Sequence, residues 1–133
     1  MNDALSIVQA FVHEFQTLGN EQVAQQLLAP DFVDHTPFPG FGGGREDVLR
    51  LFQVLRSAFP DLRAEIVEQF ANGEMVATRK TFHGTHKGEF LGAPPTGKPI
   101  AFRVVDLLRV SNGKMREHWN VVDVTSIIVQ LRS

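Results

Sequence analysis

The sequence predicts an α+β fold: a cone-shaped barrel in which a curved antiparallel sheet packs on three N-terminal helices and encloses a pocket. Two observations lead to this prediction. Apolar residues recur at helical spacing up to residue 59, and beyond Pro60 they alternate with polar residues as strands do. Two Asn-Gly pairs, at residues 72–73 and 112–113, also mark tight turns between strands. Helices followed by such a meander are typical of helices that cover one face of an antiparallel sheet.

Three helices are predicted before Pro60. Residues 2–18 carry apolar side chains every three or four positions. A shorter helix follows between Asn20, which can cap it, and Pro30, which disfavours helical geometry in the residue before it. The third helix, at residues 45–59, repeats the apolar spacing of the first and stops at Pro60.

Four strands are predicted to follow as a meander. Each Asn-Gly turn joins two of the strands into a hairpin, and a long loop at residues 88–98, rich in proline and glycine, connects the two hairpins. The expected strands cover residues 62–71, 75–86, 100–110 and 114–124.

A segment rich in proline and glycine, residues 36–44, follows a short extended stretch that ends at His35. It is unsuited to regular structure, yet it carries two large aromatic side chains, Phe38 and Phe41. We therefore expect a flap over the mouth of the pocket. Just before it, Asp34 and His35 place a carboxylate beside an imidazole at the expected rim, although adjacent residues of a strand point to opposite faces.

Composition narrows the classes of partner and of site. At 133 residues the chain is expected to be one domain, residues 1–133, and its formal net charge of −2 leaves no basic excess for binding nucleic acid. No run of about 20 apolar residues and no signal-peptide pattern is present, which predicts no membrane partner and a cytoplasmic location. The absence of cysteine excludes disulfides and thiolate sites, so that chemistry must use carboxylates, imidazoles, hydroxyls or a bound ion.

One carboxylate interrupts an apolar strand face. In the predicted third strand, alternate residues from Phe102 to Val110 are apolar except Asp106. Burial would raise the pKa of this carboxyl group unless a partner compensates, which makes Asp106 a candidate general acid or base. The alternative is that Asp106 only accepts hydrogen bonds from a neighbouring strand residue such as Arg79 or His118.

The last predicted strand has no clean apolar face, so periodicity does not show which of its side chains point inward. His118 can give and take a proton near neutral pH, and Trp119 can form a wall against a flat ligand, although both also suit structural roles. His83 and His86 lie three positions apart, which on a strand puts them on opposite faces. We therefore expect no metal site at this histidine pair.

Two stretches of the chain match the motifs of a known family. Thr81–Lys98 reads TFHGTHKGEFLGAPPTGK, and downstream come Asp106–Arg109, Asn112–Met115 and Glu117–Trp119, with Asp123 four residues after the tryptophan. The first stretch closely resembles the long loop motif of the SnoaL-like polyketide cyclase and ester cyclase family, and the downstream stretch is similar to the last hairpin of that family. The resemblance covers nearly the whole chain and implies the nuclear-transport-factor-2-like fold, shared with ketosteroid isomerase and scytalone dehydratase.

The resemblance also implies a chemistry. Cyclases of this family close a ring by an intramolecular aldol reaction without a metal or organic cofactor, and they use a pocket carboxylate to move the proton. In the alignment, the catalytic aspartate of the anthracycline cyclases falls at Asn120, and a pocket histidine of those cyclases falls at Asp106. The resemblance therefore implies that the carboxylate has moved one strand over, with His118 and Asn120 as its hydrogen-bond partners.

The hypothesis that follows is a cofactor-free enzyme acting on a hydrophobic, carbonyl-bearing small molecule. The catalytic residues are expected to be Asp106, His118, Asn120 and Asp123. The substrate-binding residues are expected to be His35, Phe38, Phe41, His83, Phe102 and Trp119.

Two other functions stay open. One is a non-catalytic small-molecule-binding protein of the same fold, and the other is an epoxide hydrolase of the limonene type, for which Asp106, Arg79 and Asp123 would have to converge. In each case, the sheet face that carries Val105 and Leu107, opposite Asp106, is expected to be covered in a homodimer.

Overall fold

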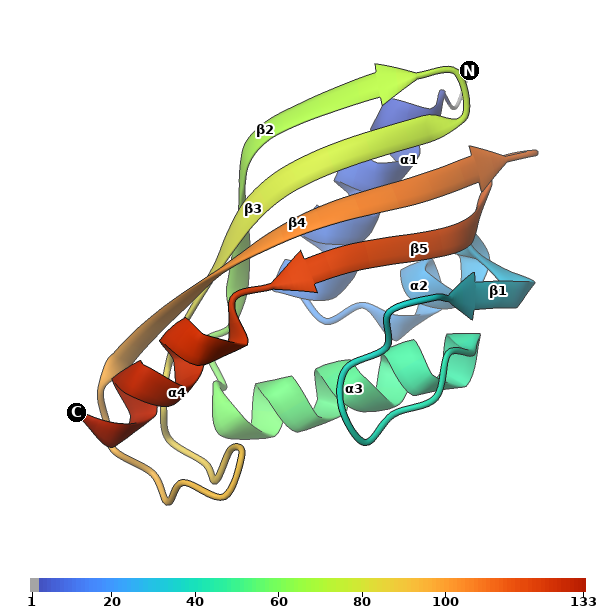
Figure 1. Ribbon diagram of the computed structural model, residues 1–133. Helices are drawn as coiled ribbons and strands as arrows, with labels where there is room; N and C mark the ends of the chain where they lie inside the picture. The colour runs from blue at the N-terminus through green and yellow to red at the C-terminus, as the bar shows by residue number, and fades with distance from the viewer. Residues whose placement is uncertain (1–2) are drawn as a thin grey trace.

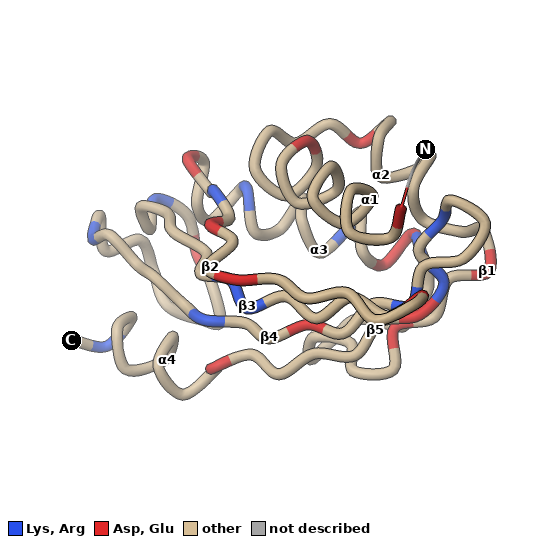
Figure 2. The backbone as a smooth tube through the Cα atoms, turned by 90° about the horizontal axis from the view of Figure 1, so that it is seen from above, with Lys and Arg blue, Asp and Glu red and all other residues tan. Residues whose placement is uncertain are grey.

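The structure is a computed structural model that describes residues 3–133. In chain order, its helical segments are α1 (Ala4–Ala10), η1 (Phe11–Thr17), α2 (Glu21–Leu27), α3 (Arg45–Ala58) and α4 (Val124–Arg132). Its strands are β1 (Leu28–Asp34), β2 (Arg63–Asn72), β3 (Met75–Thr85), β4 (Pro99–Ser111) and β5 (Lys114–Val122). They form one sheet in the order β1-β5-β4-β3-β2 (Figure 1). Figure 2 shows α1, α2 and α3 together on one side of this sheet, which confirms the α+β prediction.

The first predicted helix, residues 2–18, is observed over residues 4–17, and its first predicted residue, Asn2, lies outside the described part of the chain. Asp3 caps it, because its Oδ1 accepts a hydrogen bond of 2.7 Å from a backbone N–H of the first turn. The second half, η1, has π-helical hydrogen bonds and turns Gln16 as well as Phe15 into the interior. Arg56 of α3 donates to the backbone carbonyl oxygens at the end of η1, which a helix end would otherwise leave without partners.

Strand β1 is the main departure from the prediction. The second helix was expected to continue to Pro30, but α2 ends at Leu27 and the extended segment begins at Leu28 rather than Phe32. Proline fits here because β1 is an edge strand, where a missing N–H costs no ladder hydrogen bond. β1 pairs in parallel with β5, so the predicted antiparallel sheet gains one parallel strand at its edge and is mixed. The sheet also stays open, since no ladder joins β1 to β2 in residues 3–133.

The predicted meander is confirmed. β2, β3, β4 and β5 pair antiparallel in chain order. The second turn contains Asn112 and Gly113, both with positive φ as a two-residue hairpin turn of this kind requires, whereas the first turn is shifted by one residue to Gly73 and Glu74. Helix α3 begins one residue after Gly44, whose N–H donates to the Asp47 carboxylate at 3.1 Å.

Helix α4 was not predicted. The last strand was expected to reach Val124, but it ends at Val122, and Asp123 caps a helix that follows. Ile127 and Leu131, four residues apart, are buried against the core, and this packing overrides the strand preference of a stretch rich in β-branched residues. None of the helices in residues 3–133 has the length and apolar character needed to cross a bilayer.

A bulge in β5 decides which of its residues face the helices. Val110 pairs with Met115, but Arg109 pairs with Glu117, so that one extra residue, Arg116, is accommodated in β5. Met115 and His118 therefore point to the same face although they are three residues apart. This irregularity explains why strict alternation could not assign the faces of the last strand.

Candidate active site

A cavity of about 280 Å³ lies between the helices and the sheet. Most of its wall is apolar and aromatic, and it includes Phe52 of α3, Phe82 of β3 and Phe102 of β4. The segment predicted as a flap, residues 36–44, contributes Phe38 and Phe41 to the same wall. A pocket of this kind suits a hydrophobic small molecule.

The flap is fixed at its base by close backbone contacts. The N–H of Asp34 donates to the carbonyl oxygen of Gly43 at 2.8 Å, and a Cβ atom at Gly43 would lie only 2.6 Å from the Asp34 carbonyl oxygen. Only glycine fits this approach. Farther along the flap, Phe38 stacks on Phe90 with ring centroids 6.2 Å apart, so that an aromatic contact joins the flap to the loop that follows β3.

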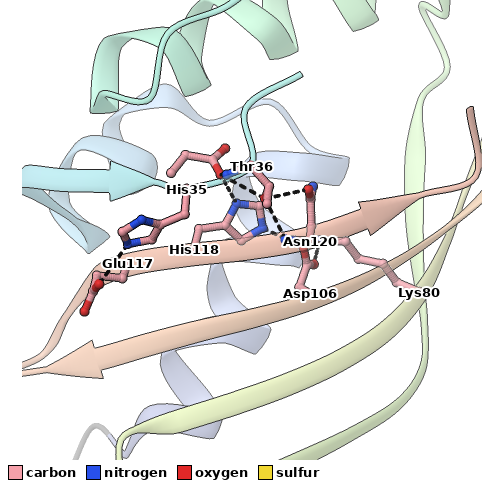
Figure 3. Close-up of polar contacts among 8 residues, drawn as sticks. His35, Thr36, Lys80, Asp106, Glu117, His118 and Asn120 are labelled. Atoms are coloured by element: carbon pink, nitrogen blue, oxygen red, sulfur yellow. Dashed lines mark hydrogen bonds and ion pairs between the residues drawn. The ribbon is translucent and has the colours of Figure 1, made fainter. Parts of the chain in front are cut away.

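Four charged side chains cross the cavity wall in an unbroken line. Asp34, His118, Asp106 and Lys80 come from β1, β5, β4 and β3, which are four consecutive strands of the sheet. His118 Nδ1 lies 3.1 Å from Asp34 Oδ1, and His118 Nε2 lies 2.7 Å from Asp106 Oδ1. Lys80 Nζ lies 2.6 Å from Asp106 Oδ2, as an ion pair rather than an aligned hydrogen bond. Figure 3 shows the His118, Asp106 and Lys80 side chains converging.

The partners of Asp106 keep it ionised. Burial alone would raise the pKa of this carboxyl group, but the Lys80 ammonium and the hydrogen bond from His118 outweigh burial and lower its pKa to about 2. This is the case in which partners compensate for burial, which the sequence left open. One of the two partners considered from the sequence, His118, does contact Asp106, whereas Arg79 pairs with Glu68 at 2.8 Å.

His118 is held as an imidazolium. Burial would lower its pKa, but hydrogen bonds to Asp106 and Asp34 outweigh burial and raise the pKa to about 9. At neutral pH both ring nitrogens therefore carry protons and donate, one to each carboxylate. Charges then alternate along the line as Asp34 negative, His118 positive, Asp106 negative and Lys80 positive.

The last carboxylate of the line, Asp34, has one oxygen free. Its Oδ1 accepts from His118 and from the backbone N–H of Thr36 at 3.0 Å, but no residue in the described part of the chain donates to Oδ2. Burial would raise the pKa of this carboxyl group, and the hydrogen bond from His118 outweighs burial and lowers it. Asp34 lines the cavity, so an ionised carboxylate oxygen is available there to a ligand.

Thr36 orients the Asn120 side chain beside Asp34. The Thr36 hydroxyl donates to Asn120 Oδ1 at 2.9 Å and accepts from the Asn120 backbone N–H at 2.7 Å (Figure 3). With Oδ1 engaged, the Nδ2 group of Asn120 is the free end of the amide, and no residue among 3–133 accepts from it. Because Asn120 lines the cavity, this amide can donate to a ligand oxygen.

Six of the ten expected site residues line the cavity. They are Asp106, His118, Asn120, Phe38, Phe41 and Phe102. The register places Asp106 directly opposite Asn120 on the neighbouring strand, but only His118 is a hydrogen-bond partner of Asp106 as the resemblance had implied, because the Asn120 side chain bonds to Thr36 instead.

Asp123 does not line the cavity, and its expected place there is wrong. β5 ends one residue before it, and its carboxylate caps α4 by accepting from the Ser126 N–H at 3.1 Å. The other oxygen pairs with Arg103 at 2.9 Å. The contact from Arg103 and that from Ser126 lower the pKa of Asp123. Asp123, Arg79 and Asp106 therefore do not converge as the epoxide-hydrolase alternative requires.

His35 and Trp119 lie on the opposite face of the sheet. Each directly follows a residue that lines the cavity, Asp34 and His118 respectively, and adjacent residues of a strand point to opposite faces. Their rings stack on each other with centroids 4.7 Å apart, and His35 Nε2 lies 2.8 Å from Glu117 Oε2. Figure 3 shows His35 turned towards Glu117 and away from His118. The expectation that they bind substrate in the cavity is wrong.

His83 is also outside the cavity, contrary to its expected role in binding substrate. Its Nε2 lies 2.9 Å from Glu65 Oε1 on the neighbouring strand β2, in a hydrogen-bonding contact at the surface. No group of three or more His, Asp or Glu side chains within residues 3–133 is arranged to hold a metal ion.

Sequence reasoning missed Lys80 and Gln16. Lys80 Nζ donates to Gln16 Oε1 at 2.8 Å, and both side chains line the cavity. Lys80 could have been found by the argument that singled out Asp106, because Val76, Thr78, Lys80 and Phe82 alternate along one strand face and all four are buried. Gln16 had no such signal, because its burial depends on the π-helical geometry of η1.

Comparison with known proteins gives consistent matches over nearly the whole chain. A family model described as SnoaL-like polyketide cyclase matches residues 6–131. The chain is similar to the aklanonic acid methyl ester cyclase DnrD of Streptomyces peucetius, with 26% identity over 136 residues that cover 98% of this chain and 92% of the relative.

Two solved structures share the fold and a comparable level of identity. IdmH of Streptomyces antibioticus, a candidate polyketide cyclase, is 31% identical with a TM-score of 0.87 over 99% of this chain and 100% of IdmH. AclR of Streptomyces galilaeus, a candidate hydroxylase, is 29% identical with a TM-score of 0.85 over 97% of this chain and 95% of AclR.

Proposed function

Because the chain belongs to the family of SnoaL-like polyketide cyclases, we propose that it is a cofactor-independent enzyme that isomerises a hydrophobic, carbonyl-bearing small molecule by aldol-type ring closure. The observation that carries the proposal is the free oxygen of Asp34. Asp34 lines the aromatic cavity; its Oδ1 is held by the His118 imidazolium, and its Oδ2 has no partner among residues 3–133.

The first step is removal of a proton from carbon. Asp34 Oδ2 takes a proton from the carbon next to a substrate carbonyl group, and the electron pair of the broken C–H bond forms an enolate. An ionised aspartate can act as the base, even with a pKa lowered by the hydrogen bond from His118, where hydrogen-bond donors stabilise the enolate oxygen. We assign that hydrogen bond to the Nδ2 group of Asn120, which lines the cavity.

The second step forms the ring. The enolate carbon attacks a second carbonyl carbon of the same molecule, a C–C bond forms, and the electron pair of the C=O bond moves to its oxygen. Asp34, now protonated, returns the proton to this alkoxide, so the product is an isomer of the substrate. One carboxylate serves both steps because the reaction needs no net gain or loss of protons.

Asp106 acts behind His118 rather than on the substrate. Both of its oxygens already have cationic partners, and a pKa of about 2 makes it a poor base at neutral pH. This arrangement favours Asp34 over Asp106 as the carboxylate that contacts the substrate. His118 contributes a positive charge next to the negative charge that develops during the reaction.

The proposal is tested by exchange and turnover measured together. Compounds with an apolar ring and two carbonyl groups, and epoxides as a comparison, are incubated with the protein in D₂O, and deuterium uptake at the carbon next to the carbonyl is followed by NMR. Asp34→Asn is expected to lower both exchange and ring closure at least ~100-fold. Asp31→Asn is the matched control, because Asp31 is also on β1 but its side chain is 82% exposed.

The outcomes of these assays distinguish the proposed enzyme from the alternatives. Full activity of Asp34→Asn would show that Asp34 is not the base. If compounds bind but neither exchange nor turnover occurs with the wild-type protein, the non-catalytic binding alternative replaces the enzyme. Opening of an epoxide without exchange at carbon would favour a hydrolase.

A further inference from the structure

Lys80 occupies an unusual place for a lysine. Its side chain is 4% exposed, lies on the inner face of β3 and lines the cavity with its Nζ 5.2 Å from the centre of the Phe82 ring. The ammonium has two partners, Asp106 Oδ2 at 2.6 Å and Gln16 Oε1 at 2.8 Å. An ammonium is costly to bury unless it is paired, so the position requires an anion at Asp106.

The site holds two carboxylates that are nearly symmetric about His118. Each accepts one ring N–H of the imidazole, and each lines the cavity. What distinguishes them is the cation on the far side of Asp106, since no cation other than His118 pairs with Asp34 among the described residues. Without that cation, two carboxylates would share one imidazolium in an apolar surrounding, and the more deeply buried one, Asp106, would take up a proton first.

We propose that Lys80 is a positioning residue that keeps Asp106 ionised and thereby leaves Asp34 as the only carboxylate of the pair that exchanges protons with substrate. The part of this inference that concerns the substrate rests on the proposed function. The part that concerns the ionisation of Asp106 does not, because it follows from the ion pair alone.

The charged surroundings of Asp106 are few and specific. Lys80 faces it from β3 and His118 from β5, while its inward-facing neighbours on β4 are Val104 and Leu108. Element η1 contributes only the uncharged Gln16, through Lys80.

Two other carboxylates lie farther away on the same cavity wall. Asp34 of β1 lies beyond His118, and Asp47 of α3 is paired with Arg50 at 2.9 Å. Among residues 3–133, removing the positive charge of Lys80 therefore removes one of only two cations that act directly on Asp106.

The test is an NMR titration of the aspartate carboxyl carbons in protein labelled at aspartate. The signals of Asp106 and Asp34 are assigned by their absence from the spectra of Asp106→Asn and Asp34→Asn. In the wild-type protein, Asp106 is expected to titrate at about 2. In Lys80→Met its pKa is expected to rise by about 1–3 units, the usual effect of one close opposite charge. Lys80→Arg keeps the charge and should keep the low value, and Lys87→Met, at an exposed lysine outside the cavity, should change nothing.

A second measurement covers the case in which Lys80→Met is unfolded at neutral pH. In the wild-type protein the folded-state pKa of Asp106 lies below the unfolded one, so its contribution to stability is present above about pH 4 and is lost as the pH falls. In Lys80→Met a rise of about 1–3 units brings the folded-state pKa close to the unfolded one, so acid should remove less stability through this group than in the wild-type protein. Urea unfolding from pH 3 to 8 should therefore show a smaller acid-dependent loss of stability from Asp106 in Lys80→Met than in the wild-type protein. The contribution of Asp106 is taken as the difference from Lys80→Met/Asp106→Asn in the variant and from Asp106→Asn in the wild-type protein.

Activity provides the last readout. If the enzyme works as proposed, Lys80→Met should move the acid limb of the kcat/KM profile to higher pH, and Lys80→Arg should restore it. The inference is overturned if Asp106 still titrates below pH 3 in Lys80→Met, or if the acid-dependent loss of stability from Asp106 is as large as in the wild-type protein. Loss of the proposed function would appear instead as an inactive wild-type protein whose Asp106 titrates as expected.

Discussion

The most direct consequence of the charge line is a dependence of stability on His118 in the alkaline range. In the folded protein the pKa of His118 is about 9, against 6.5 for an ordinary histidine. Folding therefore binds the proton more tightly, and the stabilisation is fully present below pH 6.5 and lost as the pH rises through 9. At about 1.4 kcal/mol for each pH unit, the difference corresponds to about 3 kcal/mol of unfolding free energy.

Two features of the chain make this prediction easy to measure. There is no cysteine and no tyrosine, so histidines and the terminal amine account for most titration between pH 6 and 9.5. Urea unfolding curves at half-unit pH intervals give the unfolding free energy of the wild-type protein, of His118→Gln, and of His13→Gln, whose side chain is on the surface of η1.

The expected result is a loss of about 3 kcal/mol between pH 6 and 10 in the wild-type protein and in His13→Gln, and a nearly flat profile in His118→Gln. A wild-type profile as flat as that of His118→Gln would refute the reasoning, because it would mean that folding does not change the affinity of His118 for its proton. A parallel decline in all three proteins would assign the effect to other groups.

Two further predictions concern residues outside the cavity. Asp123→Ala should lower the unfolding free energy, measured by urea unfolding, by about 1 kcal/mol, the usual cost of losing a helix cap. It should leave kcat/KM in turnover assays unchanged. A loss of turnover at full stability would instead place Asp123 in the active site. The outer sheet face exposes Val105, Leu107 and Val121, and we expect a homodimer that buries this face. Light scattering after gel filtration should therefore give the mass of a dimer for the wild-type protein and of a monomer for Val121→Glu. A wild-type monomer would contradict this expectation.

Much of the fold could be predicted because local signals and tertiary packing agree. The apolar spacing of residues 45–59 and the alternation in β4 each describe a surface that must be buried, and both elements form where the pattern indicates. The same alternation placed Asp106 on the inner face, because an alternating strand leaves no other position for it.

The predictions that were wrong or incomplete concern residues whose structure is decided by tertiary contacts rather than by their local sequence. Pro30 signals the end of a helix, and only its position on an edge strand makes it compatible with β1. The bulge at Arg116 cancels the period of two in β5, so His118 could be identified as a candidate but not oriented. Lys80 was passed over because a lysine in a strand is ordinarily exposed, and what buries it is a partner on another strand.

The site itself depends on the feature that the sequence predicted least well, the parallel pairing of β1 with β5. This pairing sets Asp34 directly opposite His118, and the backbone N–H of His35 holds the register by donating to the His118 carbonyl oxygen at 2.9 Å. A shift of one residue would turn Asp34 to the outer face and bring His35 into the cavity. The carboxylate that contacts substrate in the proposed mechanism is therefore selected by strand register, and a single sequence shows that register only through residues far apart in the chain.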